Sequence, residues 1–71
     1  MIEKGSKIRV SDNLKQKLEE LDFFKDEARI FAARFAGTIQ TAHDIWTDSD
    51  GRTYVTVDLC CEIPIECCES I

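Results

Sequence analysis

The hydrophobic pattern of the chain changes its period twice. Residues 7–10 (KIRV) alternate polar with apolar and are rich in β-branched side chains, which is typical of a strand. From residue 12 to residue 36 there is neither glycine nor proline. Over that span the apolar positions recur at helical spacing: Leu14, Leu18, Leu21, Phe24, Ala28, Phe31 and Phe35. We therefore expect a strand followed by a helical segment that packs this stripe into the core.

The helical segment is too long to be one helix packed on a small domain. A continuous helix over residues 12–36 would extend about 36 Å at 1.5 Å per residue. A break is expected in LDFFKDE (21–27), because Asp22 or Asp26 can cap a second helix. Ser11 or Asp12 is predicted to cap the first helix. Both one-helix and two-helix arrangements stay open.

After Gly37 the pattern predicts β-structure. Residues 37–46 (GTIQTAHDIW) and 52–60 (RTYVTVDLC) flank TDSDG, whose Asp-Gly pair is a hairpin signal. The expected product is two long antiparallel strands. The second strand alternates an inner set with a solvent-facing set: Val55, Val57 and Leu59 against Tyr54, Thr56 and Asp58.

The segment CCEIPIECC (60–68) raises the question of a metal site. Structural zinc usually takes paired thiols separated by two to four residues, whereas these pairs are adjacent. Neighbouring side chains on a strand point to opposite faces, so the two thiols of a pair diverge. We expect no metal ligand here and interpret the cysteines as small buried hydrophobes around a turn that starts at Pro64.

Composition restricts the classes of function. The 71 residues suffice for one domain, 1–71, with a core so small that self-association becomes attractive. No apolar run approaches the ~20 residues of a membrane span, and the N-terminus lacks the apolar stretch of a signal peptide. We expect a soluble cytoplasmic protein without membrane contact, and four reduced cysteines.

The net charge of −5 is unevenly distributed. Residues 1–36 hold eight Lys/Arg and seven Asp/Glu (8 − 7 = +1), whereas residues 37–71 hold Arg52 and seven acids (1 − 7 = −6). Because phosphate contacts dominate nucleic-acid affinity, the acidic second half argues against a nucleic-acid partner. It is better suited to a basic protein surface, although an acidic solvated face with no partner is the commoner case.

No catalytic or cofactor-binding residue emerges from the motifs. In WTDSDG, alignment of Gly51 with the glycine of a calcium loop leaves Trp46 and Val57 at essential ligand positions. His43, the only histidine, is expected to be structural, on a strand in phase with Ile39 and Ile45. There is no phosphate-binding glycine loop and no nucleophile motif. We expect neither enzymatic activity nor a bound cofactor.

Short segments of this chain resemble the sequences of two known families. KGSKIRV (4–10) with YVTVDL (54–59) resembles strands of the photosystem I E subunit, a small barrel that helps dock ferredoxin. IPIECCESI (63–71) is similar to the end of type II dihydrofolate reductases, barrels from mobile resistance elements. The resemblance implies an α+β, mainly β fold: a small SH3-like barrel of about five strands, with one or two helices inserted at residues 12–36. Residues 60–63 lack the folate- and nicotinamide-binding pattern of the reductases, so no site residue transfers. A barrel of this kind implies that Cys61 and Ile63 line the approach to the turn, that Ile65 and Cys68 pack inward through it, and that Ile71 closes the core.

Two hypotheses about function follow. The first is a non-catalytic protein-binding or accessory module that docks on another protein or on itself, with a homodimer as the expected oligomer. Its expected contact residues are Leu14, Leu18, Leu21, Phe24, Phe31 and Trp46. The alternative is a small-molecule- or metal-binding protein, with a site formed across subunits of an oligomeric enzyme carried on a mobile gene cassette.

Overall fold

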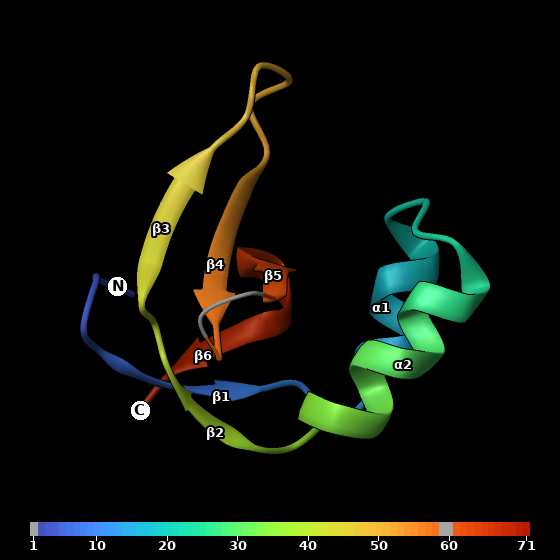
Figure 1. Cartoon of the computed structure of the whole chain (residues 1–71), viewed down its shortest axis with the longest axis horizontal. Helices are drawn as coiled ribbons and strands as arrows, with labels where there is room; N and C mark the ends of the chain where they lie inside the picture. The colour runs from blue at the N-terminus through green and yellow to red at the C-terminus, as the bar shows by residue number, and fades with distance from the viewer. Residues whose placement is uncertain (1, 59–60) are drawn as a thin grey trace.

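Six short strands and two α-helices make up the described part of the chain, which is residues 2–58 and 61–71 of a computed structural model. The strand β1 (Lys7–Val10) precedes the helices α1 (Leu14–Glu20) and α2 (Lys25–Phe35). The strands β2 (Ile39–Thr41), β3 (Asp44–Thr47), β4 (Thr53–Val57) and β5 (Cys61–Pro64) follow, and the 3₁₀ turn η1 (Ile65–Cys67) leads into β6 (Cys68–Ser70). The two helices lie together beside one end of the strands (Figure 1).

The strands form two three-stranded antiparallel sheets, in the orders β2-β1-β6 and β3-β4-β5. The α+β class and the helices after the first strand are confirmed. The barrel of about five strands stays unconfirmed, because no strand pairing among the described residues closes the two sheets into one.

The predicted long strand over residues 37–46 is wrong: it is two strands in different sheets. The N–H of Ala42 donates to the Ser6 carbonyl at 2.8 Å, which continues the β1–β2 ladder. The N–H of the next residue, His43, donates to the Thr56 carbonyl at 2.9 Å, which begins the β3–β4 ladder. Ala42 is fully buried where the chain changes sheets. The hairpin at the Asp-Gly turn is confirmed, with Ile45 opposite Val55 and Thr47 opposite Thr53.

The predicted helix break lies between Glu20 and Lys25, but Asp22 is not a cap of the second helix. It adopts a left-handed conformation (φ 68°) that ends α1. The N–H of Asp22 donates to the Glu19 carbonyl at 3.1 Å, and the N–H of Phe23 to the Leu18 carbonyl at 3.0 Å. This pair of bonds is the Schellman motif, in which the left-handed position is usually glycine. The sequence signal was therefore missed because aspartate occupies that position.

The predicted side-chain caps are also corrected. The first residue before α1 is Asn13 and that before α2 is Phe24, and neither makes a capping hydrogen bond through its side chain. Ser11 Oγ donates to Asn13 Oδ1 instead, and Asp12 pairs with Arg9 at 3.5 Å. Asp26 lies in the first turn of α2, where a negative charge is favoured by the helix dipole.

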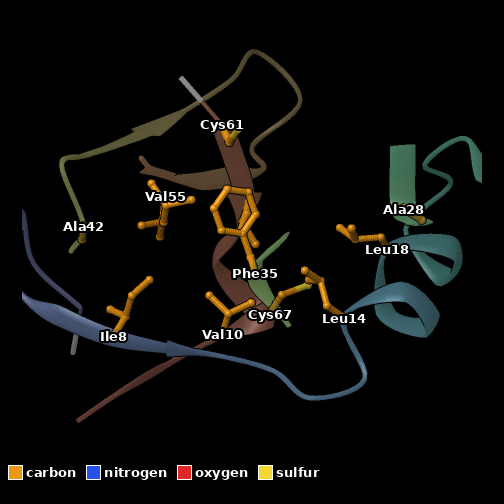
Figure 2. Close-up of a cluster of buried hydrophobic side chains, with 12 residues drawn as sticks. Ile8, Val10, Leu14, Leu18, Ala28, Phe35, Ala42, Val55, Cys61 and Cys67 are labelled. Carbon is orange, nitrogen blue, oxygen red and sulfur yellow. The ribbon is translucent and has the colours of Figure 1, made fainter. Parts of the chain in front are cut away.

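One hydrophobic core joins the helices to both sheets. Within the described ranges, twelve buried residues form it: Ile8, Val10, Leu14, Leu18, Ala28, Phe35, Ala42, Val55, Val57, Cys61, Ile63 and Cys67. In Figure 2 the ring of Phe35 lies at the centre of the labelled side chains, between Leu14 on the helix side and Val55 on the sheet side. The helical stripe is thus core as expected, except that Leu21 and Phe31 are half-buried and Phe24 is exposed.

The C-terminal turn buries a different cysteine from the one predicted. Cys61 and Ile63 are buried as expected, but Cys67 is the buried thiol of its pair and Cys68 is half-buried. Residues 65–67 form a 3₁₀ turn that rotates Cys67 inward, and β6 starts only at Cys68. Ile71 does not close the core, because it is 71% exposed beyond the end of β6. Leu59 and Cys60 lie outside the described residues.

The burial of Cys67 generates a stability prediction. Cys67→Val should change the free energy of unfolding by less than ~1.5 kcal/mol, because volume and apolarity are kept. Cys67→Asp should be far more destabilising, since it buries an unpaired carboxylate, and more harmful than Cys68→Asp at the half-buried neighbour. Denaturant unfolding with and without a chelator measures both. Chelator-sensitive stability in the parent, together with a severe loss in the valine variant, would instead indicate a metal ligand.

Substitution of Gly37 is predicted to cost more stability than substitution of Gly51, although both glycines have positive φ. The φ of Gly37 is +73°, and an added Cβ would lie 2.5 Å from Asp12 Oδ1, whereas Gly51 (φ +85°) has open space. Gly37→Ala should cost about 1–3 kcal/mol from backbone strain, with displacement of Asp12 in addition. Thermal unfolding of both alanine variants is the measurement. Equal losses at the two glycines would contradict the close approach of Asp12.

Candidate functional site

The structure leaves only part of the predicted contact set available to a partner. Leu14 and Leu18 are fully buried, so they serve the core and not a contact surface. Leu21 and Phe31 are half-buried, Phe24 is 78% exposed and Trp46 is 38% exposed. An accessible surface must therefore be sought around Phe31, Trp46 and their neighbours.

Phe31 and Trp46 line the same groove, although they lie on α2 and on β3. The groove measures about 350 Å³ and runs between the helix and the β3-β4-β5 sheet. We call it the aromatic–acidic groove. Its lining residues are Phe23, Glu27, Phe31, Trp46, Asp48, Tyr54 and Glu62.

The helical wall of the groove follows from the way α1 ends. The Schellman motif reverses the chain direction at Asp22, and Phe23 lies in the short connection that leads into α2. Phe23, Glu27 and Phe31 then follow one another at intervals of four residues, which places them along one side of the segment. The ring of Phe31 meets that of Phe35 edge-to-face at 6.4 Å, which connects this wall to the core.

The sheet wall follows from the register of the hairpin. Trp46 pairs with Tyr54 across β3 and β4, and their rings stack with centroids 5.0 Å apart and planes at 28°. Asp48 belongs to the hairpin turn, where its Oδ1 accepts the N–H groups of Asp50 at 2.9 Å and Arg52 at 3.0 Å. The carboxylate is thereby held at the end of the Trp46–Tyr54 pair.

The electrostatic character of the groove is negative. Three of its seven lining residues are the carboxylates Glu27, Asp48 and Glu62, and the described lining includes no Lys or Arg. Desolvation and then the neighbouring Asp48 raise the pKa of the Tyr54 phenol, while Arg52 opposes them, so the phenol stays protonated at physiological pH. A groove with this lining is suited to a group that is both apolar and positively charged.

Arg52 marks the end of the groove. A smaller hollow of about 270 Å³, which shares Phe23 and Glu27 with the groove, is lined by Arg52 on its far side. The Arg52 guanidinium donates to the Leu21 carbonyl at 3.0 Å. This arginine of the second half is thus bound to the loop between the helices.

The remaining candidates do not assemble a chemical site. His43 is exposed between β2 and β3, so its predicted placement within a strand is corrected. Among residues 2–58 and 61–71, no three of the His, Cys, Asp and Glu side chains lie where they could share a metal ion. Cys67 and Cys68 are free thiols.

Burial changes the acidity of these two thiols. Desolvation raises the pKa of Cys67 to about 11, with Glu66 adding to the increase and Lys17 opposing it. Desolvation, followed by the charges of Cys67 and Glu66, raises the pKa of Cys68 to about 12. Both side chains are therefore protonated at physiological pH and are weak nucleophiles.

Neither helix in the described part of the chain has the length and apolarity needed to cross a membrane. Comparisons of the chain with protein-family models, curated proteins and solved structures find no match.

Sequence reasoning found Phe31 and Trp46 but missed most of the groove. The three carboxylates lie on α2, in the turn between β3 and β4, and on β5, and no sequence spacing links them: Glu27, Asp48 and Glu62. The pairing of Trp46 with Tyr54 was implicit in the hairpin, because two positions equidistant from a turn face each other. That symmetry was the one sequence signal that could have indicated the site.

The raised thiol pKa values predict a loss of stability at high pH. Below pH 9.0, the ordinary value, Cys67 is protonated in both the folded and unfolded chain. Between pH 9.0 and about 11 the unfolded chain ionises this thiol while the folded chain does not, so stability falls. Denaturant unfolding from pH 8 to pH 10.5 should show a steeper fall for the parent than for Cys67→Val. Parallel curves would contradict the burial of an ionisable thiol.

Proposed function

We propose that this chain is a non-catalytic protein-binding module that docks on a basic segment of another protein through the aromatic–acidic groove. The observation that carries the proposal is the composition of the groove, which combines four aromatic rings with three carboxylates. Aromatic side chains supply much of the binding energy at protein interfaces. The carboxylates select a partner of opposite charge.

The charge of the second half supports the same partner. Six of its seven acids would remain uncompensated by Arg52, and two of them, Asp48 and Glu62, line the groove. An acidic surface repels phosphate, so a nucleic acid is a poor occupant. A lysine- or arginine-rich protein segment meets complementary charge at every carboxylate of the groove.

Self-association is a second use for the surface around α2. Phe24 and Ile30 are 78% and 52% exposed there, so both apolar side chains are accessible to a second copy of the chain. A two-fold contact through these residues would leave the described groove available. Sedimentation equilibrium of the parent and of Ile30→Lys separates a dimer of this kind from a monomer.

The small-molecule alternative has its own test on the same groove. The volume of the groove, about 350 Å³, lies at the lower end of the range for ligand pockets, ~300–1,000 Å³. The likeness to SH3-like barrels, and to type II reductases in particular, is proposed at the level of fold alone. Thermal-shift measurements with folate and nicotinamide cofactors should show no stabilisation.

Peptide binding tests the proposed function directly. A fluorescein-labelled decapeptide that alternates Arg or Lys with Gly and Ser should bind, and its glutamate counterpart should not, by fluorescence anisotropy. Trp46→Ala and Glu62→Gln should each weaken binding about threefold or more, as expected for an exposed cation–π contact or ion pair. Glu69→Gln is the matched control, because it removes the same charge from β6 in the other sheet.

Two results would reject the proposal. One is absence of binding by the basic peptide at low ionic strength. The other is equal weakening by Glu62→Gln and Glu69→Gln, which would show that the peptide responds to net charge and not to the groove.

A further inference from the structure

The rings of Trp46 and Tyr54 provide a platform within the groove. They stack face to face with their planes 28° from parallel, so the outer face of the stack is what a ligand can meet. Paired strands carry the two rings, so the backbone ladder sets their relative position. Trp46 keeps 38% of its surface exposed despite the stack. The electron-rich faces of such rings attract cations, and tryptophan attracts them most strongly.

The carboxylates approach this platform from different directions. Asp48 follows β3 at the hairpin turn, Glu62 projects from β5, and Glu27 comes from α2 on the opposite wall. Asp48 accepts two backbone N–H groups through Oδ1, and its carboxylate also interacts with the Tyr54 phenol. A carboxylate has about four acceptor sites, so it can accept a further donor beside these. A ligand on the rings therefore meets negative charge around its edge and aromatic surface on its face.

A guanidinium fits this distribution better than an ammonium does. It is planar, stacks on aromatic faces, and is weakly hydrated, while its five N–H groups lie at its edge and pair with carboxylates. A lysine ammonium is a compact, strongly hydrated charge that loses more on leaving water. An aromatic face with carboxylates at its border thus favours a ligand group that is planar as well as positively charged.

The same protein contains an internal example of this recognition. The guanidinium of Arg34 lies 5.0 Å from the centroid of the Phe35 ring. Its Nη2 also donates to Asp58 Oδ2 at 2.7 Å. Its Nη1 also lies 3.8 Å from Cys61 Sγ. An aromatic ring and a carboxylate thus take part in holding an arginine side chain at the surface of this fold, and the aromatic–acidic groove offers more of both.

With the proposed function as its premise, we infer that the groove recognises one arginine side chain of the partner. The guanidinium stacks on the Trp46–Tyr54 pair and donates hydrogen bonds to the carboxylates of Asp48 and Glu62. Phe23 and Phe31 cover the aliphatic part of the side chain from the helical wall.

The test compares three small compounds that carry the same two end groups. N-acetyl-arginine methylamide, its lysine counterpart and its citrulline counterpart are titrated into ¹⁵N-labelled protein, with the indole N–H of Trp46, the only tryptophan, as reporter. The arginine compound should shift this resonance and the amides of residues 27, 48 and 62. The lysine compound should bind about threefold or more weakly, and neutral citrulline about tenfold or more weakly.

Variants locate the contact. Trp46→Phe retains an aromatic side chain of smaller area, and Trp46→Ala removes it, so affinity for the arginine compound should fall in that order, read from the amides of residues 27 and 62. Glu62→Gln should reduce the preference for arginine over citrulline, while the Glu69→Gln control should leave it unchanged.

The outcomes separate this inference from the function on which it rests. Equal shifts with lysine and arginine, together with binding of the basic decapeptide, would overturn the arginine preference and leave the protein-binding function standing. Equal shifts with citrulline would show that shape and not charge governs the groove. If neither the arginine compound nor the decapeptide binds, both proposals fail.

Discussion

The packing of Phe35 into the core is the interaction on which the arrangement of this protein depends. This residue ends α2, is 3% exposed, and lies among side chains from the first helix and from both sheets (Figure 2). Truncating a buried phenylalanine typically costs about 3–5 kcal/mol, a large share of the stability of a small domain. Besides Phe35, the ion pair between Arg34 and Asp58 connects α2 to the end of β4. If these contacts were lost, the helix would lose its position beside the β3-β4-β5 sheet.

The groove is a consequence of that attachment. One wall is the α2 segment, positioned by Phe35 and by the Schellman motif at Asp22, and the other is the hairpin, positioned by its ladder. Neither wall alone brings aromatic rings and carboxylates together. The change of sheet between Ala42 and His43 matters for the same reason, because it aligns β3 with β4 and not with β1.

Several features were predictable because they depend on neighbours along the chain. The helical stripe, the hairpin, the turn at Pro64 and the buried faces of Val55 and Val57 follow from local periodicity and turn chemistry. Other predictions were wrong because of the local backbone conformation at one or two residues. Cys67 replaced Cys68 in the core because a 3₁₀ turn rotates side chains differently from a strand, and the sequence does not say where one gives way to the other. Asp22 ended a helix in place of starting one because it took a conformation that most residues avoid.

The sequence by itself determined the order of helix and strand, the hydrophobic stripe and the division of charge between the two halves. These properties arise from residues close together in the chain, where period and composition carry the information. Only the tertiary structure decided that residues 37–46 divide between two sheets and that Glu27, Asp48 and Glu62 share one groove with Phe31 and Trp46. Contacts of this kind join segments that are distant in sequence. Their geometry is set by how the core closes around Phe35, which no local pattern encodes.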